Sequence, residues 1–213
     1  MPVAVIDLTR TLCDDMPVFP GDNPIRLKPA ATIEKHGFTN YRIETGMHVG
    51  THMDGPLHMI PGGMPLTDMP PERFVGRGVL VDARKCGEII HSDILEPYSI
   101  SQGDIVLFRT DWCAQFGTET YYFDYPVLEP RCADLLVQLK VNMIGLDFPS
   151  PDKAPFPVHQ ILLGNNILII ENLQGLANLK GVGKFRICAL PLKLEADSAP
   201  ARVIALTEED EAI

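Results

Sequence analysis

The chain has 213 residues, of which 46% are apolar and 22% are charged, as in ordinary globular domains. Its formal net charge of −10 argues against nucleic acid and anionic membranes as partners, because both attract clustered Lys and Arg. No linker, internal repeat or low-complexity segment interrupts the sequence. We therefore expect a single domain over residues 1–213.

The N-terminus lacks a basic segment and has too short an apolar run for a signal peptide, and no apolar run is long enough to span a membrane. The acidic run at 208–211 is typical of a solvated end. The cysteines are odd in number, widely spaced and never in a C-x-x-C pair: Cys13, Cys86, Cys113, Cys132 and Cys188. This pattern predicts reduced thiols in a cytoplasmic protein.

Short runs rich in β-branched and other apolar residues predict strands along the whole chain. We expect them at 3–8, 39–45, 78–82, 104–110, 141–147, 166–170, 187–192 and 201–206, with the alternating strand 39–45 half-buried. The clearest helix covers 129–140, with Pro130 in its first turn and a leucine stripe. Segments 16–24, 59–73 and 149–157, all rich in proline, are predicted loops. Many strands and few helices predict a mixed α/β fold.

Residues 48–58 read HVGTHMDGPLH and contain three of the six histidines. A helix would place His48 and His52 on one face, but Gly50 and Pro56 disfavour a helix here. In an extended strand, His48, Gly50, His52 and Asp54 would share a face instead. Imidazole and carboxylate groups together suit Zn²⁺ and, more weakly, Mn²⁺ or Fe²⁺. The spacing therefore predicts a metal site.

Three further residues have a functional and a structural interpretation. His159 follows a proline-rich loop and precedes an apolar run, and Glu171 ends an apolar strand, where a carboxylate is costly unless paired or metal-bound. Spacing alone does not bring either residue to His52. Phe19 lies between two prolines and would either face a ligand or anchor the loop, and the residues alone favour the anchor.

The pattern H-x-G-T-H-x-D-x-P-x-H at 48–58 resembles the signature of the putative cyclase family, which includes the bacterial kynurenine formamidases and the isatin hydrolases. Segments that resemble the family occur in order along nearly the whole chain: Asp7-Leu8-Thr9, Phe19-Pro20-Gly21-Asp22, Leu107-Phe108-Arg109-Thr110, Gly145-Leu146-Asp147-Phe148-Pro149-Ser150, His159-Gln160, Glu171-Asn172 and Ala189-Leu190-Pro191-Leu192. The resemblance implies a swivelling β/β/α-type domain with a barrel-like mixed sheet core. It also implies a homodimer or homotetramer.

The resemblance implies one or two divalent metal ions per chain, with zinc as first choice and manganese as second. His48, His52 and Asp54 match ligands of one ion. Asp54 would bridge to a second ion that matches His159 and Glu171, with Glu171 also reaching the first.

The resemblance assigns two further roles. His58 matches the residue that donates and accepts a proton. Phe19 falls where the formamidases have a tryptophan that contacts substrate, so this chain keeps an aromatic face but lacks the indole N–H donor. Strand alternation, and not the resemblance, points Thr51 away from the ligands and gives it a role in fixing the backbone. We expect Asp147 likewise to orient an imidazole or a loop.

These roles predict a metal-dependent hydrolase of a small aryl or cyclic amide, acting on a non-peptide C–N bond. The first substrate to test is N-formylkynurenine, an intermediate of tryptophan catabolism, and the second is an isatin-like lactam. A cyclase or dehydratase could use the same polarised carbonyl and base. A non-catalytic metal-binding protein is a third possibility, but a structural zinc site would be closed and richer in cysteine.

Overall fold

The strands of this chain pair into a single large sheet and two small ones, and a computed structural model describes them over residues 4–207. The strands are β1 (Val5–Asp7), β2 (Arg26–Ala31), β3 (Asn40–Glu44), β4 (His52–Asp54), β5 (Val75–Asp82), β6 (Ile89–Ile90), β7 (Ile105–Arg109), β8 (Val127–Leu128), β9 (Met143–Leu146), β10 (Leu168–Glu171), β11 (Phe185–Pro191) and β12 (Ser198–Thr207). The helices within this range are α1 (Ile33–His36), α2 (Glu119–Phe123), α3 (Pro130–Gln138) and α4 (Pro157–Gly164).

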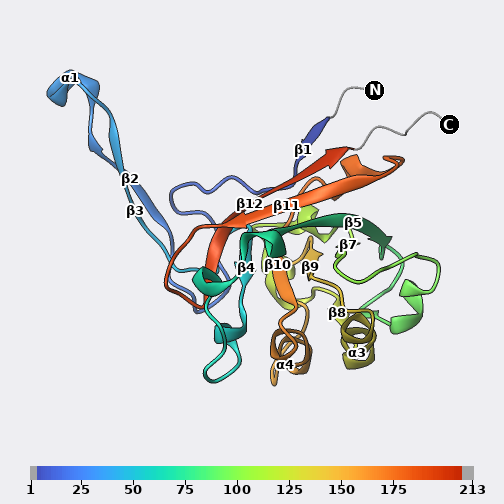
Figure 1. The fold of residues 1–213 in the computed structure, drawn as a ribbon. Coiled ribbons are helices and arrows are strands. Elements are labelled where there is room, and N and C mark those ends of the chain that lie inside the picture. The colour runs from blue at the N-terminus through green and yellow to red at the C-terminus, as the bar shows by residue number, and fades with distance from the viewer. Residues whose placement is uncertain (1–3, 208–213) are drawn as a thin grey trace.

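The large sheet has the order β1-β12-β11-β5-β7-β9-β10-β4, and a further pairing of β12 with β4 closes seven of its strands into a barrel. Strands β5, β7, β9 and β10 run parallel to their neighbours in this series, whereas β4, β11 and β12 pair antiparallel. Figure 1 shows α3 and α4 side by side on one flank of the sheet. The predicted mixed α/β fold with a barrel-like core is confirmed.

Strand β7 separates the two main apolar cores, because successive side chains point to opposite faces of a strand. Val106 and Phe108 pack with α3 and α4 on the helical side. Ile105 and Leu107 belong to the second core, which contains residues of β9, β10, β11 and β12. A strand buried on both faces reads as a continuous apolar run, and the predicted strand at 104–110 has this character.

The hairpin formed by β2 and β3 projects from the barrel, with α1 at its tip (Figure 1). The prediction of a strand at 39–45 is confirmed, but the prediction that it is half-buried is wrong. Every residue of β3 is exposed, including Tyr41 at 58% and Ile43 at 53%, because β3 pairs only with β2. We call the segment 26–44 the arm.

The helix predicted at 129–140 is confirmed as α3, with Leu136 fully buried. Helix α4 was not predicted, and it carries His159 on its buried side. The predicted strand at 3–8 is present as β1, but its first residue lies outside the described residues, as does the acidic run at 208–211. Among residues 4–207, no helix is long and apolar enough to cross a membrane.

Candidate metal centre

The segment 48–58 enters the barrel through a sharp bend and not through one continuous strand. The extended part covers only β4, so the prediction of a strand from His48 onwards is wrong. Gly50 has a φ of +62°, and a Cβ added there would lie 2.6 Å from a methyl group of Leu12. Glycine tolerates both conditions, which explains why the chain turns at this position.

Barrel closure brings ligand groups from distant segments to β4. His52 lies directly opposite Glu171 in the antiparallel pairing with β10, and its Nε2 is 3.3 Å from Glu171 Oε2. Helix α4 directs His159 to the same point, with its Nε2 3.5 Å from Glu171 Oε1 and 3.8 Å from Asp54 Oδ2. The two candidates that spacing alone could not place therefore lie beside the motif.

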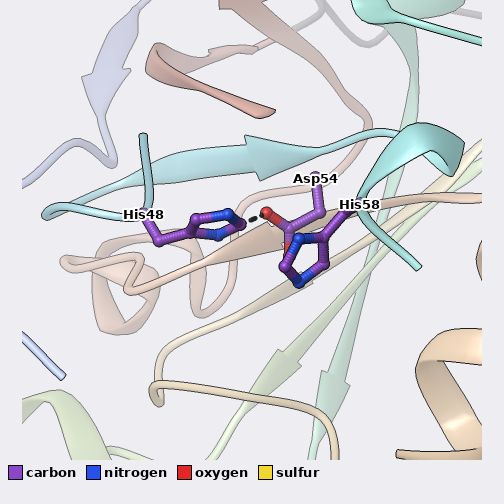
Figure 2. Close-up of side chains that lie close together, drawn as sticks. All are labelled: His48, Asp54 and His58. Carbon is purple, nitrogen blue, oxygen red and sulfur yellow. Dashed lines mark ion pairs between the residues drawn. The ribbon is translucent and has the colours of Figure 1, made fainter. Parts of the chain in front are cut away.

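Asp54 lies at the centre of the cluster. Figure 2 shows the rings of His48 and His58 turned toward its carboxylate, and His48 Nδ1 is 3.1 Å from Asp54 Oδ1. His58 comes from the 3₁₀ turn Pro56–His58, and its ring centroid lies 4.3 Å from that of His48. Two triads could each hold a metal ion, and they share Asp54: His48, Asp54 and His58, and His52, Asp54 and Glu171.

Each of the three histidines predicted to bind metal has one ring nitrogen held by the protein. His52 Nδ1 lies 2.9 Å from the carbonyl oxygen of Gly50, and His159 Nδ1 lies 2.6 Å from Asp152 Oδ1. His48 Nε2 lies 3.0 Å from Asp197 Oδ2. Metal-binding histidines are usually oriented in this way by an oxygen on the second nitrogen. The free nitrogens all face Asp54.

The polar atoms at the centre of the cluster fit a cation. His52 Nε2 and both carboxylate oxygens of Asp54 are buried without a hydrogen-bond partner among the described residues. Leaving such groups unpaired in a protein interior is costly. A divalent metal would satisfy all three atoms, and a set of imidazole and carboxylate donors matches zinc or manganese.

The charges of the cluster support the same interpretation. Burial alone would lower the pKa values of His48 and His159, but the surrounding carboxylates outweigh it and raise them to about 10 and about 12. Burial alone would raise the pKa of Asp54, yet His52 and its neighbours hold it well below its usual range. The site is therefore strongly anionic and favours positive charge, which protons or a metal ion can supply.

A cavity of about 200 Å³ opens over the cluster. Its walls include four aromatic residues, Phe19, Phe116, Tyr122 and Phe156. Phe19 packs edge-to-face on Tyr122 with ring centroids 6.0 Å apart. None of the described residues that line the cavity is Lys or Arg. The cavity suits a small aromatic molecule placed next to the candidate metal ligands.

Sequence reasoning missed two acidic residues, Asp152 and Asp197, which contact the imidazoles of His159 and His48. Asp152 lies in the loop predicted at 149–157, and no motif marks it. Thr51 fixes the backbone as expected, because its hydroxyl donates to the carbonyl oxygen of Asn172 at 2.8 Å. Asp147 accepts hydrogen bonds from the backbone amides of Thr110 and Asp111, so it orients a loop and not an imidazole.

Comparison with known proteins gives consistent results. The family model described as "Putative cyclase" matches residues 6–153. A kynurenine formamidase from Bordetella avium (strain 197N) is 30% identical over 204 residues, which cover 93% of this chain and 95% of the relative. Among solved structures, isatin hydrolase A from Labrenzia aggregata bound to benzyl benzoate aligns with a TM-score of 0.87 at 25% identity, covering 97% and 94% of the two chains. A potential metal-dependent hydrolase with cyclase activity aligns with a TM-score of 0.81 at 30% identity, covering 98% and 100%.

Proposed function

The chain belongs to the putative cyclase family, and we propose that it is an arylformamidase-type enzyme that hydrolyses N-formylkynurenine to kynurenine and formate. It is a metal-dependent hydrolase that acts on amide C–N bonds. The proposal rests on one observation: imidazole nitrogens converge on the Asp54 carboxylate, which has no hydrogen-bond partner among residues 4–207, under a cavity with aromatic walls.

In this proposal the predicted residues divide into two ligand sets. His48, His52 and Asp54 would hold one divalent ion, and Asp54, His159 and Glu171 would hold a second, with Glu171 also reaching the first. Zinc is the first choice and manganese the second, because both accept imidazole nitrogen and carboxylate oxygen. The short distances from Asp54 to the rings of His48, His52 and His159 support its place in both ligand sets. The division of the other residues follows the family resemblance, because the triads that converge in the structure instead group His58 with His48 and Glu171 with His52.

A divalent metal in this site would lower the pKa of a bound water molecule and polarise the substrate carbonyl. His58 lies at the cavity and is 22% exposed at its side chain, so it can meet both water and substrate. We assign it the transfer of a proton from the attacking water to the leaving nitrogen, which is general acid–base catalysis. Phe19 and Tyr122, packed on each other, form an aromatic wall of the cavity against which the aryl ring of the substrate would lie.

The test of this function is hydrolysis of N-formylkynurenine by zinc-loaded and manganese-loaded protein, with chelated protein as the blank. We expect release of kynurenine and formate in equal amounts. Absence of turnover in protein that demonstrably contains metal would contradict the formamidase assignment.

A second candidate substrate is an isatin-like lactam, and the lining of the cavity favours it. N-formylkynurenine carries an α-carboxylate, yet none of the described lining residues is a Lys or Arg that could pair with it. Isatin is uncharged and needs no such partner. The ratio of kcat/KM for the two substrates, measured on one preparation, decides between them.

The arm supports the proposal that the protein is a homodimer or homotetramer. Four large apolar side chains, Ile33, Phe38, Tyr41 and Ile43, are each more than half exposed on it. Apolar patches on a projecting hairpin commonly mark protein interfaces. Sedimentation equilibrium of wild-type protein and of Phe38→Glu tests this, and we expect the variant to dissociate toward a monomer. A monomeric wild-type protein would contradict it.

We also propose that the chain forms one domain and functions in the cytoplasm. The large sheet pairs β1 and β12, from the two ends of the described chain, and β12 also belongs to the closed barrel, which supports a single folding unit. All five cysteines are free, as is usual in a reducing compartment. Coincident unfolding curves from fluorescence and circular dichroism would test the first statement, and fractionation of cells that express the protein would test the second.

A further inference from the structure

We propose that Asp197 is a positioning residue for the reaction, which fixes the tautomer and direction of the His58 ring. The inference rests on the proposed function, in which His58 transfers a proton. It assigns a task to a residue that no motif in the sequence marks. Three observations carry it: the backbone connection, the hydrogen bonds of the carboxylate, and the difference between the partners of His48 and His58.

The backbone ties Asp197 to the segment that carries His58. Asp197 directly precedes β12, and its carbonyl oxygen accepts a hydrogen bond from the amide of Gly55 at 3.0 Å. Gly55 in turn begins the 3₁₀ turn that ends at His58. The next residue, Ser198, lies opposite Asp54 in the β12–β4 pairing. Barrel closure therefore sets the distance between the Asp197 carboxylate and the His58 ring.

One oxygen of this carboxylate contacts both imidazoles at the edge of the site. Asp197 Oδ2 lies 3.1 Å from His58 Nδ1 and 3.0 Å from His48 Nε2. An ionised carboxylate only accepts hydrogen bonds, so each of these nitrogens must donate a proton to it. A neutral imidazole with its proton on Nδ1 has a lone pair on Nε2. Asp197 thus leaves Nε2 of His58 as the atom that takes and returns the proton.

The two histidines differ in how much they depend on Asp197. His48 Nε2 has a second partner, because Ser198 Oγ lies 3.0 Å from it. Among the described residues, the His58 ring has only Asp197 as a hydrogen-bond partner. Loss of the carboxylate should therefore release His58 while His48 keeps a contact. The carboxylate is 36% exposed, so its removal leaves no buried hole in the core.

The experiment compares Asp197→Ala, Asp197→Asn and the control Glu195→Ala, whose side chain is exposed and two residues away. Three quantities are measured on zinc-loaded protein: metal content, kcat and KM for the best amide substrate, and the imidazole ¹⁵N spectrum. We expect Asp197→Ala to retain metal and KM and to lose about 10- to 100-fold in kcat, the usual effect of removing such a partner. Its His58 signals should change from the Nδ1–H tautomer to a mixture.

Asp197→Asn keeps one oxygen that can accept a hydrogen bond, so we expect partial recovery of both kcat and the Nδ1–H tautomer. Glu195→Ala should match wild type. An unchanged tautomer or an unchanged kcat in Asp197→Ala overturns the inference, and so does loss of metal, which would mean that Asp197 serves His48. If wild-type protein hydrolyses none of the amides, the proposed function fails, and the ¹⁵N spectra still decide whether Asp197 sets the tautomer.

Discussion

Replacement of Asp152 by alanine should weaken both metal binding and folding. Its Oδ1 is 2.6 Å from His159 Nδ1, and its Oδ2 accepts from the amides of Val158 and His159 at 2.6 and 3.2 Å, at the start of α4. Loss of this cap costs about 1–2 kcal/mol of folding free energy. Loss of a carboxylate that orients a metal-binding imidazole typically costs about 10- to 100-fold in affinity, or roughly 1.4–2.7 kcal/mol.

The assay is urea unfolding of the metal-free protein, followed by competition of the refolded protein with a chromophoric zinc chelator. Asp134→Ala is the matched control, because that residue is an exposed aspartate on α3. We expect Asp152→Ala to lose both stability and zinc affinity, and the control to lose neither. Wild-type zinc affinity in a folded Asp152→Ala protein would refute the idea that Asp152 orients His159 for a metal.

Three further predictions concern different parts of the molecule. Gly50→Ala should lower the free energy of unfolding by at least about 1–2 kcal/mol, which is the cost of a left-handed backbone at a non-glycine residue. The added Cβ would also clash with Leu12 and increase the loss. An unchanged urea midpoint would contradict this. The hydrogen bond from His91 lowers the pKa of Glu129 from 4.5 to about 2. The ionised Glu129 carboxylate therefore stabilises the fold above pH 4.5, and this stabilisation is lost as the pH falls toward 2. Glu129→Gln should therefore lose less stability on acidification than wild type, and parallel acid-unfolding curves would count against it. His58→Ala should retain its metal and lose about 10²- to 10⁴-fold in kcat, and a variant purified without metal would instead identify His58 as a ligand.

The sequence predicts the parts of the fold that local pattern determines. The apolar run at 104–110 is buried on both faces of β7, and Leu136 of the leucine stripe packs on the buried side of α3. The sequence also locates the metal-site motif at 48–58, since His48, Asp54 and His58 converge, although only residues 52–54 of the expected strand are extended. In these segments the interactions that decide the structure lie close together in sequence.

The remaining features depend on contacts between distant segments. The alternation at 39–45 is typical of a half-buried strand. In the structure β3 pairs with β2 and with no other strand of the described chain, so both of its faces are exposed on the arm. Asp197 reaches His58 across 139 residues because β12 pairs with β4. His159 reaches the site because α4 begins after Phe156, whose φ of +63° turns the chain. No spacing rule in a single sequence encodes these contacts.

The central claim is that this cluster binds the metal on which amide hydrolysis depends. The most direct measurement is a titration of chelated wild-type protein and of His52→Ala with zinc and with manganese, which follows bound metal and amide turnover together. Circular dichroism confirms that both proteins are folded. We predict that turnover in wild type returns in proportion to one or two bound ions per chain, while His52→Ala stays metal-poor and inactive. Full turnover in chelated wild type, or undiminished turnover in His52→Ala, would contradict the claim.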